Sequence, residues 1–376
     1  MRFSGVIGLA AATASLALLA ETSKPAPVAT PAVVHPLVRH ASVVNGDLAH
    51  HVDDIIRRQT AFSGAVIVES HGRVVLDAGY GLADRGRALP FTTETIAPIG
   101  SITKQFTASA ILALHQQGRV DLDRPLKLYL KGIAEPAASL TIRHLLSHTS
   151  GVADNCPGGD FKKTSLSDLL STCAALPLAY PKGTWHYSNL GYSCLAAVVE
   201  AVSRQPLQTL LEESYFVPYH MTKTNDSFST IQMQRWTLAK EYEEQSSHEN
   251  VAVAIARLNG QDWNLKGNGD LQSSTRDMLR WYHALRHAPE LEYIRAGLLH
   301  PTARNPIGTY YTNGWFIRMD PRMKAYNVFH SGSDGSLLAY FGWWPKSDLF
   351  IYYVSNFGSE RSLPTLKAIL ALFPRH

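Results

Sequence analysis

The sequence predicts an α+β protein in which one antiparallel sheet is formed from both chain ends and flanked by terminal helices, with an inserted, mostly helical lobe. Strand-like runs of apolar and β-branched residues occur between residues 64 and 80 and again between 314 and 354. From about 101 to 300, apolar residues recur at helical spacing instead. This order favours a single sheet lobe, comprising about 46–100 and 301–376, with the helical lobe inserted into it.

The first twenty residues have the pattern of an export signal. Arg2 provides a positive charge, Val6 to Ala20 form an apolar run, and cleavage can follow Ala17 or Ala20. The run is short for a membrane span, so an uncleaved anchor is the alternative and no stable membrane span is expected after processing. We therefore expect residues 1–20 to be a signal peptide and the protein to be exported, either periplasmic or secreted.

The next elements are expected in a regular order. Residues 21–45 are rich in Pro, Ala, Val and Thr without periodicity, which is typical of a linker. A helix is then predicted near 47–59, followed by strands at 64–69 and 74–80 that are joined by a hairpin turn. The folded domain is therefore expected to cover 46–376.

Later elements follow from the same periodicities. Helices are predicted at 101–117, 141–147, 166–176, 190–203, 207–215 and 274–287. Strands are predicted at 314–318, 326–330, 337–344 and 349–354, with a closing helix at 362–372. A cleft between the sheet and the helical lobe is the expected place for a ligand.

The amino-acid composition indicates a globular protein and limits the classes of partner that it can bind. The chain has 376 residues with 45% hydrophobic content, enough for a large core. Its 35 Lys and Arg against 31 Asp and Glu give a formal net charge of +4 without a long basic run, so no nucleic-acid partner is predicted.

The three cysteines suggest a disulfide rather than a metal site. In an oxidising compartment, Cys156 and Cys173 could close a loop within one lobe, and this pairing is a hypothesis. Cys194 lies in an apolar helical run and is expected to be buried. No CxxC pattern is present, so thiolate metal binding is not predicted, and no cofactor is expected.

Two histidine pairs have the i, i+4 spacing of metal ligands. They are His144 with His148, and His283 with His287. Neither has the glutamate of an HExxH motif or an evident third ligand, so we interpret them as packing or solvated residues. His148 is expected to stabilise its own turn rather than to contact a substrate.

Ser101 and Lys104 form the first candidate catalytic pair. They fall in the first turn of a predicted helix, and residues three apart share a helix face. A serine nucleophile needs such a proton partner, and the N–H groups at a helix start can stabilise an oxyanion. Ser-x-x-Lys also occurs by chance, and a serine at a helix start is often only a cap, so the pair alone is weak evidence.

Tyr187 and Asn189 form a second candidate group, in Tyr187-Ser188-Asn189 just before a predicted helix. A tyrosine near a lysine can share its proton, and an asparagine amide can hold a substrate amide or ester. Taken singly, both are also common turn residues.

The end of a predicted strand provides the third group, His330-Ser331-Gly332-Ser333. A glycine there would let a substrate lie along the strand edge. The alternative is a strand-end histidine without a role.

Together and in this order, these motifs resemble the serine β-lactamase and penicillin-binding-protein superfamily. The likeness is closest to class C β-lactamases and to the related D-amino-acid peptidases and β-lactamase-fold esterases. It spans about 47 to 372 and includes Gly269 to Met278, which is similar to the family's glycine-led start of a late helix. The resemblance implies the β-lactamase/transpeptidase-like fold, in agreement with the element order.

The resemblance also implies roles for the candidate residues. Ser101 matches the nucleophile and Lys104 its proton partner. Tyr187 matches a general base that later helps to activate water, and Asn189 matches a substrate-binding amide. The backbone N–H groups of Ser101 and Ser333 would form the oxyanion hole. Whether Lys104 or Tyr187 takes the first proton stays open.

His330 departs from the pattern, because many relatives active on β-lactams have a lysine at that position. A histidine with a pKa of about 6.5 is mostly neutral at pH 7 and attracts a substrate carboxylate less strongly. We therefore expect ester or peptide substrates, including cell-wall-derived ones, bound near His330, Ser331, Gly332 and Ser333. The alternatives are a true β-lactamase, a slowly deacylating penicillin sensor and an inactive relative.

Overall fold

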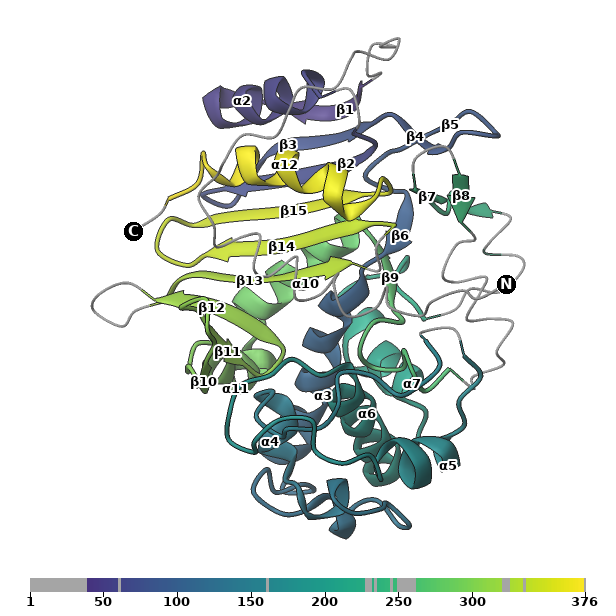
Figure 1. Cartoon of the computed structure of the whole chain (residues 1–376). Helices are drawn as coiled ribbons and strands as arrows, with labels where there is room; N and C mark the ends of the chain where they lie inside the picture. The colour runs from purple at the N-terminus through teal and green to yellow at the C-terminus, as the bar shows by residue number, and fades with distance from the viewer. Residues whose placement is uncertain are drawn as a thin grey trace.

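The structure is a computed structural model. It describes residues 39–59, 62–159, 162–226, 232, 235–243, 246–248, 262–319, 325–333 and 336–374. The predicted signal peptide and most of the predicted linker lie outside the described residues. Two regions are evident in Figure 1, a large sheet with helices on its faces and a group of helices and loops beside it.

Nine antiparallel strands form the large sheet in the order β1-β3-β2-β15-β14-β13-β12-β11-β10. Their bounds are β1 Arg39–Val44, β2 Gly64–Ser70, β3 Arg73–Tyr80, β10 Ala303–Arg304, β11 Tyr310–Thr312, β12 Trp315–Met319, β13 Ala325–Ser333, β14 Leu338–Trp344 and β15 Leu349–Ser355. Strands from the two ends of the chain meet where β2 pairs with β15, from Gly64 opposite Ser355 to Ser70 opposite Leu349. This confirms the predicted sheet built from both termini (Figure 1).

Helices cover both faces of the sheet (Figure 1). They are α2 Gly46–Arg57 and α12 Ser359–Leu370 on one face and α10 Thr275–His287 on the other. On the α10 face, the Tyr282 ring stacks on Phe350 of β15 with 4.3 Å between ring centres. On the opposite face, Trp344 of β14 stacks on Phe373 at 4.6 Å. α10 lies within the range predicted for the helical lobe, yet it packs on the sheet.

Strand β1 corrects the linker prediction, which extended to residue 45. Its backbone pairs with β3, from Arg39 opposite Tyr80 to Val44 opposite Leu76. Arg39 also forms an ion pair with Asp53 of α2 at 2.7 Å. Both contacts are long-range, so the local composition of residues 39–44 could not reveal the strand.

The helical region is assembled from short elements. They are η1 Gly100–Ile102, α3 Thr103–Gln116, η2 Leu126–Leu128, η3 Ala137–Ser139, α4 Ile142–Leu146, α5 Leu166–Asp168, η4 Leu169–Cys173, α6 Asn189–Ser203, α7 Leu207–Leu211, η5 Glu212–Phe216, η6 Pro289–Leu291 and α11 Glu292–Leu298. Helix α3 is buried along most of its length, and its Phe106 packs against Trp281 of α10 at 4.6 Å between ring centres. The helix that carries the candidate lysine, and that directly follows the candidate serine in η1, is therefore anchored in the core.

Three small two-stranded sheets were not predicted from the sequence. They are β4 Leu82–Asp84 with β5 Leu89–Pro90, β6 Ile96–Pro98 with β9 Gln272–Ser274, and β7 Glu241–Glu243 with β8 Ser246–His248. Strands of two or three residues are too short to show alternation. The β6–β9 pair matters for the site, because the next residue, Ile99, donates its N–H to the Leu271 carbonyl at 3.0 Å and fixes the approach to Ser101.

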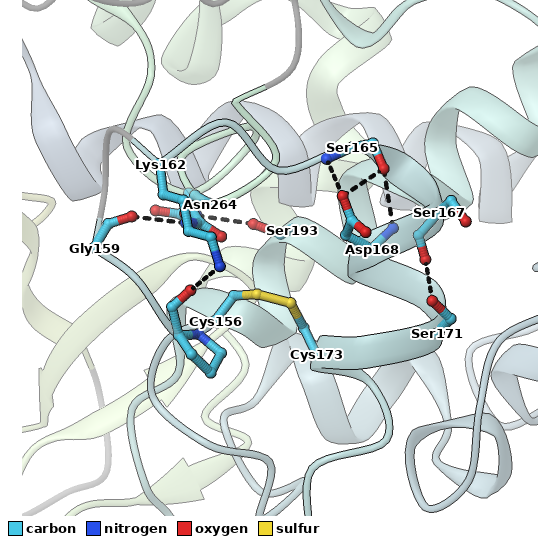
Figure 2. The surroundings of a disulfide bond; sticks show 12 residues. Cys156, Gly159, Lys162, Ser165, Ser167, Asp168, Ser171, Cys173, Ser193 and Asn264 are labelled. Carbon is cyan, nitrogen blue, oxygen red and sulfur yellow. Dashed lines mark hydrogen bonds between the residues drawn. A yellow bond between two sulfur atoms is a disulfide. The ribbon is translucent and has the colours of Figure 1, made fainter.

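A disulfide joins Cys156 and Cys173, whose Cα atoms are 5.2 Å apart (Figure 2). This confirms the proposed pairing. Cys194 is free and buried, as expected. In the part of the chain that the structure describes, no helix is both long and apolar enough to span a bilayer.

Candidate active site

Two glycines bring the start of the serine-bearing helix against the end of β13. Gly100 has φ +51°, and a Cβ there would lie 2.9 Å from the Ser333 nitrogen. A Cβ on Gly332 would lie 1.9 Å from the Ile99 carbonyl oxygen and 3.2 Å from the Ser101 nitrogen. Side chains at either position would therefore force the two segments apart. The predicted oxyanion donors, the N–H groups of Ser101 and Ser333, lie on these two adjoining segments.

Lys104 is the centre of the polar network around Ser101. Its side chain is fully buried, and Nζ contacts Ser101 Oγ at 3.0 Å. Nζ also donates to Asn189 Oδ1 at 2.8 Å and to the Asn268 carbonyl oxygen at 2.7 Å. Both of those oxygens can only accept, so they hold two N–H groups of the lysine whether it is charged or neutral. In the neutral state, the lone pair of Nζ then faces the Ser101 hydroxyl.

Asn189 is held at the start of α6. The preceding residue, Ser188, caps the helix by accepting the Gly191 N–H at 3.0 Å. The Asn189 side-chain amide donates through Nδ2 to Asn155 Oδ1 at 2.8 Å. This contact turns Oδ1 of Asn189 towards Lys104 and leaves the second N–H of the amide for another acceptor.

Tyr187 lies against the same lysine. Its side chain is buried, and the Lys104 Nζ is 4.8 Å from the centre of the ring. The hydroxyl makes no hydrogen bond of regular geometry with any described residue. Burial raises the pKa of the Tyr187 phenol well above its ordinary value, and the nearby Ser101 side chain opposes part of that rise. The phenol is therefore protonated at neutral pH.

His148 is a further residue of the site, beyond the role in its own turn that the sequence suggested. Its ring lies 4.3 Å from the Tyr187 ring and 4.4 Å from the Tyr311 ring. Its Nδ1 accepts the Ser188 N–H at 3.2 Å. Burial and the charge of Lys104 lower the pKa of His148 well below its ordinary value. His148 is therefore neutral, and its ring packs against the Tyr187 ring.

His330 is buried beside this cluster rather than exposed on the strand edge. Because a carbonyl can only accept, the 2.6 Å contact between Nδ1 and the Ser331 carbonyl places the proton on Nδ1. Nε2 can then accept from the Tyr311 hydroxyl at 3.4 Å. Burial, followed by the charge of Lys104, lowers the pKa of His330 to about 3. His330 is therefore neutral at pH 7.

The predicted residues gather in one place. Ser101, Lys104 and Asn189 are joined by hydrogen bonds, and Tyr187 packs on Lys104. The Ser331 to Ser333 end of β13 adjoins Gly100 and Ser101, with Gly332 in direct contact. Asn155 and Asn268, which hold these groups, were not predicted, because they are distant in the chain and belong to no motif.

The sequence comparison then identifies the family. The profile of the Beta-lactamase family matches residues 48–372. The chain belongs to the β-lactamase family. This confirms the superfamily that the sequence was predicted to resemble.

Several relatives extend this result. Protein flp of Staphylococcus aureus (strain NCTC 8325 / PS 47) is 27% identical over 336 residues, which cover 84% of this chain and 65% of that protein. The chain thus spans about two thirds of the length of this curated relative. The penicillin-binding protein of Bacillus halodurans is 26% identical with a TM-score of 0.70, covering 87% of this chain and 100% of that one. A class C β-lactamase of Rhodobacter sphaeroides, 19% identical with a TM-score of 0.70, shares the fold over 86% of this chain and 98% of that one.

The two histidine pairs of this β-lactamase-family chain have structural partners. His144 Nδ1 accepts the Thr141 N–H at 3.2 Å and completes the cap of α4. His283 Nε2 contacts Glu69 Oε2 at 2.6 Å on the sheet face. Among the described residues, no group of three or more His, Cys, Asp or Glu side chains is placed to hold a metal ion.

Proposed function

We propose that this protein is an exported serine hydrolase that forms an acyl-enzyme on Ser101 and prefers ester or peptide carbonyls to β-lactams. Members of the β-lactamase family are typically serine hydrolases. The observation that carries the proposal is the buried Lys104, whose Nζ lies 3.0 Å from Ser101 Oγ while two carbonyl oxygens hold its other N–H groups. Besides satisfying these two buried oxygens, the amine lies where a serine nucleophile requires a base.

In the first step, neutral Lys104 accepts the Ser101 proton as Oγ bonds to the substrate carbonyl carbon. The carbonyl oxygen becomes an oxyanion, and the N–H groups of Ser101 and Ser333 would stabilise it. Lys104 is better placed than Tyr187 to act first, because the raised pKa of the Tyr187 phenol leaves it protonated. A neutral lysine in this role requires a desolvated site, and Lys104 is fully buried.

Tyr187 serves the second half of the reaction. When the tetrahedral intermediate collapses, the leaving group takes the Tyr187 proton, and Tyr187 recovers one from the Lys104 ammonium. Water then attacks the acyl carbon, giving its proton to the same pair, and Ser101 Oγ departs with a proton. The cycle ends with Ser101, Lys104 and Tyr187 in their starting states.

The substrate preference rests on His330. A lysine at this position would place a positive charge beside the substrate, whereas the His330 ring is buried and its pKa is lowered to about 3. A substrate carboxylate therefore gains no ion pair with this residue at neutral pH. Esters and peptides that do not depend on such a carboxylate fit the site better than penicillins.

Export is supported by two features. The signal-like pattern of residues 1–20 directs a chain to the secretory route. The Cys156–Cys173 disulfide is a bond that forms and persists in oxidising compartments. N-terminal sequencing of protein recovered outside the cytoplasm tests this directly, and a chain that retains Met1 would contradict the cleaved signal.

The function is tested by comparing kcat/KM for a p-nitrophenyl ester, a D-alanyl-D-alanine peptide amidated at its C-terminus and a chromogenic cephalosporin, with His330→Lys as the matched variant. We expect the ester or the peptide to be turned over faster than the cephalosporin by the wild type. His330→Lys should shift the ratio towards the cephalosporin. Efficient cephalosporin turnover by the wild type would overturn the preference, and an adduct that persists for hours would favour a penicillin sensor instead.

A further inference from the structure

The segment Asp154–Gly159 is linked to Lys104 by two chains of hydrogen bonds. At its first end, the Asp154 carbonyl accepts the backbone N–H groups of Asn189 and Leu190, at 2.7 and 3.1 Å. This places the segment directly on the N-terminus of α6, which carries Asn189. The disulfide at Cys156 lies within the same segment.

The first path to Lys104 runs through Asn155. Its Oδ1 accepts the Asn189 Nδ2 hydrogen at 2.8 Å, and Asn189 Oδ1 in turn accepts from Lys104 Nζ at 2.8 Å. If the Asn189 amide were reversed, its N–H group would point at an ammonium that can only donate. The Asn155 oxygen therefore selects the amide orientation that leaves Lys104 correctly partnered.

The second path runs through the other end of the segment. The Gly159 carbonyl accepts Asn264 Nδ2 at 2.7 Å, and the Asn264 carbonyl accepts Asn268 Nδ2 at 2.7 Å. The Asn268 carbonyl then accepts from Lys104 Nζ at 2.7 Å. Both acceptors that orient the lysine are thus linked to one short stretch of chain.

The disulfide lies between these two anchoring points. Cys156 follows Asn155 directly and precedes Gly159 by three residues, and it is bonded to Cys173 at the end of η4 (Figure 2). Figure 2 shows Gly159 and Asn264 beside this bond. Pro157, Gly158 and Gly159 are exposed, so little side-chain packing holds this part of the segment. Lys162 donates hydrogen bonds to the carbonyls of Pro157 and Gly159, and the covalent bond adds a further restraint.

We propose that Asp154–Gly159, fixed by the Cys156–Cys173 disulfide, is a positioning element for Lys104, with Asn155 as its positioning residue. The inference rests on the proposed serine-hydrolase function. It assigns Asn155 no contact with the reacting atoms. Its role is to hold the Asn189 amide so that the third position of Lys104 Nζ faces Ser101.

The test uses the full-length, processed protein and a small p-nitrophenyl ester. Asn155→Ala removes the acceptor, whereas Asn155→Asp retains an oxygen at the same place. We expect kcat of Asn155→Ala to fall about ten- to hundredfold with KM little changed, because misplacement of a catalytic group slows chemistry rather than binding. Asn155→Asp should recover most of the loss, which a merely structural role for this side chain does not predict.

The disulfide is tested by the double variant Cys156→Ser/Cys173→Ser, alone and combined with Asn155→Ala. Removing the bond should lower kcat in the wild-type background and lower it less when Asn155 is already absent, because only the path through Gly159 then remains. Ser165→Ala is the matched control. It removes the N-cap of α5, where Ser165 Oγ accepts the Asp168 N–H at 3.1 Å, near the same disulfide (Figure 2). It should lower local stability without lowering kcat.

The outcomes separate this inference from the function on which it rests. If Ser101→Ala abolishes turnover but Asn155→Ala retains wild-type kcat, the positioning role is wrong and the serine-hydrolase function stands. Equal losses from the disulfide variant in both backgrounds would show that the tether does not act through Asn155, and would overturn the proposal. Retained turnover in Ser101→Ala would instead refute the function itself.

Discussion

Lys104 Nζ lies 4.8 Å from the centre of the Tyr187 ring, yet the Tyr187 hydroxyl has no regular hydrogen bond with the described residues. An aromatic face stabilises a nearby cation, so the ring favours a charged Lys104 after it has taken a proton. Near the Ser101 side chain but without a hydrogen bond of regular geometry, this buried hydroxyl adds little to stability. We therefore expect the Tyr187 hydroxyl to form its hydrogen bond with a bound substrate.

Tyr187→Phe should separate catalysis from stability. The ring and its contact with Lys104 are kept, and no hydrogen bond of regular geometry is lost. We expect kcat to fall roughly 10²- to 10⁴-fold, as for the loss of a proton-transfer group. The free energy of unfolding, measured by urea denaturation, should stay unchanged or rise. A clear loss of stability would show that the hydroxyl makes a strong hydrogen bond in the free protein.

Lys104→Met should reduce both the rate of ester hydrolysis and the stability of the protein. The methionine fills much of the same space but leaves Asn189 Oδ1 and the Asn268 carbonyl without their buried donor. Each unsatisfied acceptor costs about 1–3 kcal/mol, so the midpoint of urea unfolding should fall. Ester hydrolysis should be lost together with acylation of Ser101. Retained acylation would show that the lysine is not the base.

Gly332→Ala should damage the site through backbone displacement. The new Cβ would lie 1.9 Å from the Ile99 carbonyl, which is too close for any rotamer change to relieve. We expect lower thermal stability and at least a tenfold loss of kcat/KM, because the two segments that carry the oxyanion donors must separate. Gly86→Ala is the control, since its nearest neighbour is the tip of the Asp84 side chain at 3.4 Å. Wild-type activity in Gly332→Ala would contradict this close approach.

The buried His330 should make stability depend on pH. Its pKa is about 3 in the folded chain and about 6.5 when unfolded, so the unfolded state binds the proton between these values. The His330 contribution to stability is complete above about pH 6.5 and is lost as the pH falls towards 3, by roughly 1.4 kcal/mol per pH unit.

His330→Asn isolates this effect while retaining a donor for the Ser331 carbonyl. Buried aspartates such as Asp270, whose pKa is raised by burial, act in the opposite direction and are common to both proteins. The difference between the two curves of unfolding free energy against pH should therefore grow between pH 6.5 and 4. Parallel curves would show that His330 is protonated in the folded state.

Sequence periodicity was sufficient for the main architecture. The strands around 64–80 and 314–354 and the helix that follows Ser101 were predictable, because each contains a run of apolar residues that is buried at most positions. Strand β1 and the two- and three-residue strands were not, since their stability comes from partners elsewhere in the chain. α10 had the expected helical pattern, but periodicity alone could not show that it packs on the sheet.

The candidate residues of the site could be predicted from the sequence, whereas the residues that support them could not. Ser101 and Lys104 share a helix turn, which local spacing reveals. Asn155 and Asn268 act on Lys104 across 51 or more positions of sequence, and no short pattern marks such a contact. For His330, the ordinary pKa already suggested a neutral ring, and the fold adds the burial that lowers its pKa further.

The central claim is that Ser101 forms an acyl-enzyme, and intact-protein mass spectrometry after exposure to a fluorophosphonate or a labelled penicillin tests it most directly. The wild type should gain the mass of one adduct on Ser101, and folded Ser101→Ala should gain none. A folded wild type without an adduct from either reagent, or an equal adduct on Ser101→Ala, would contradict the account.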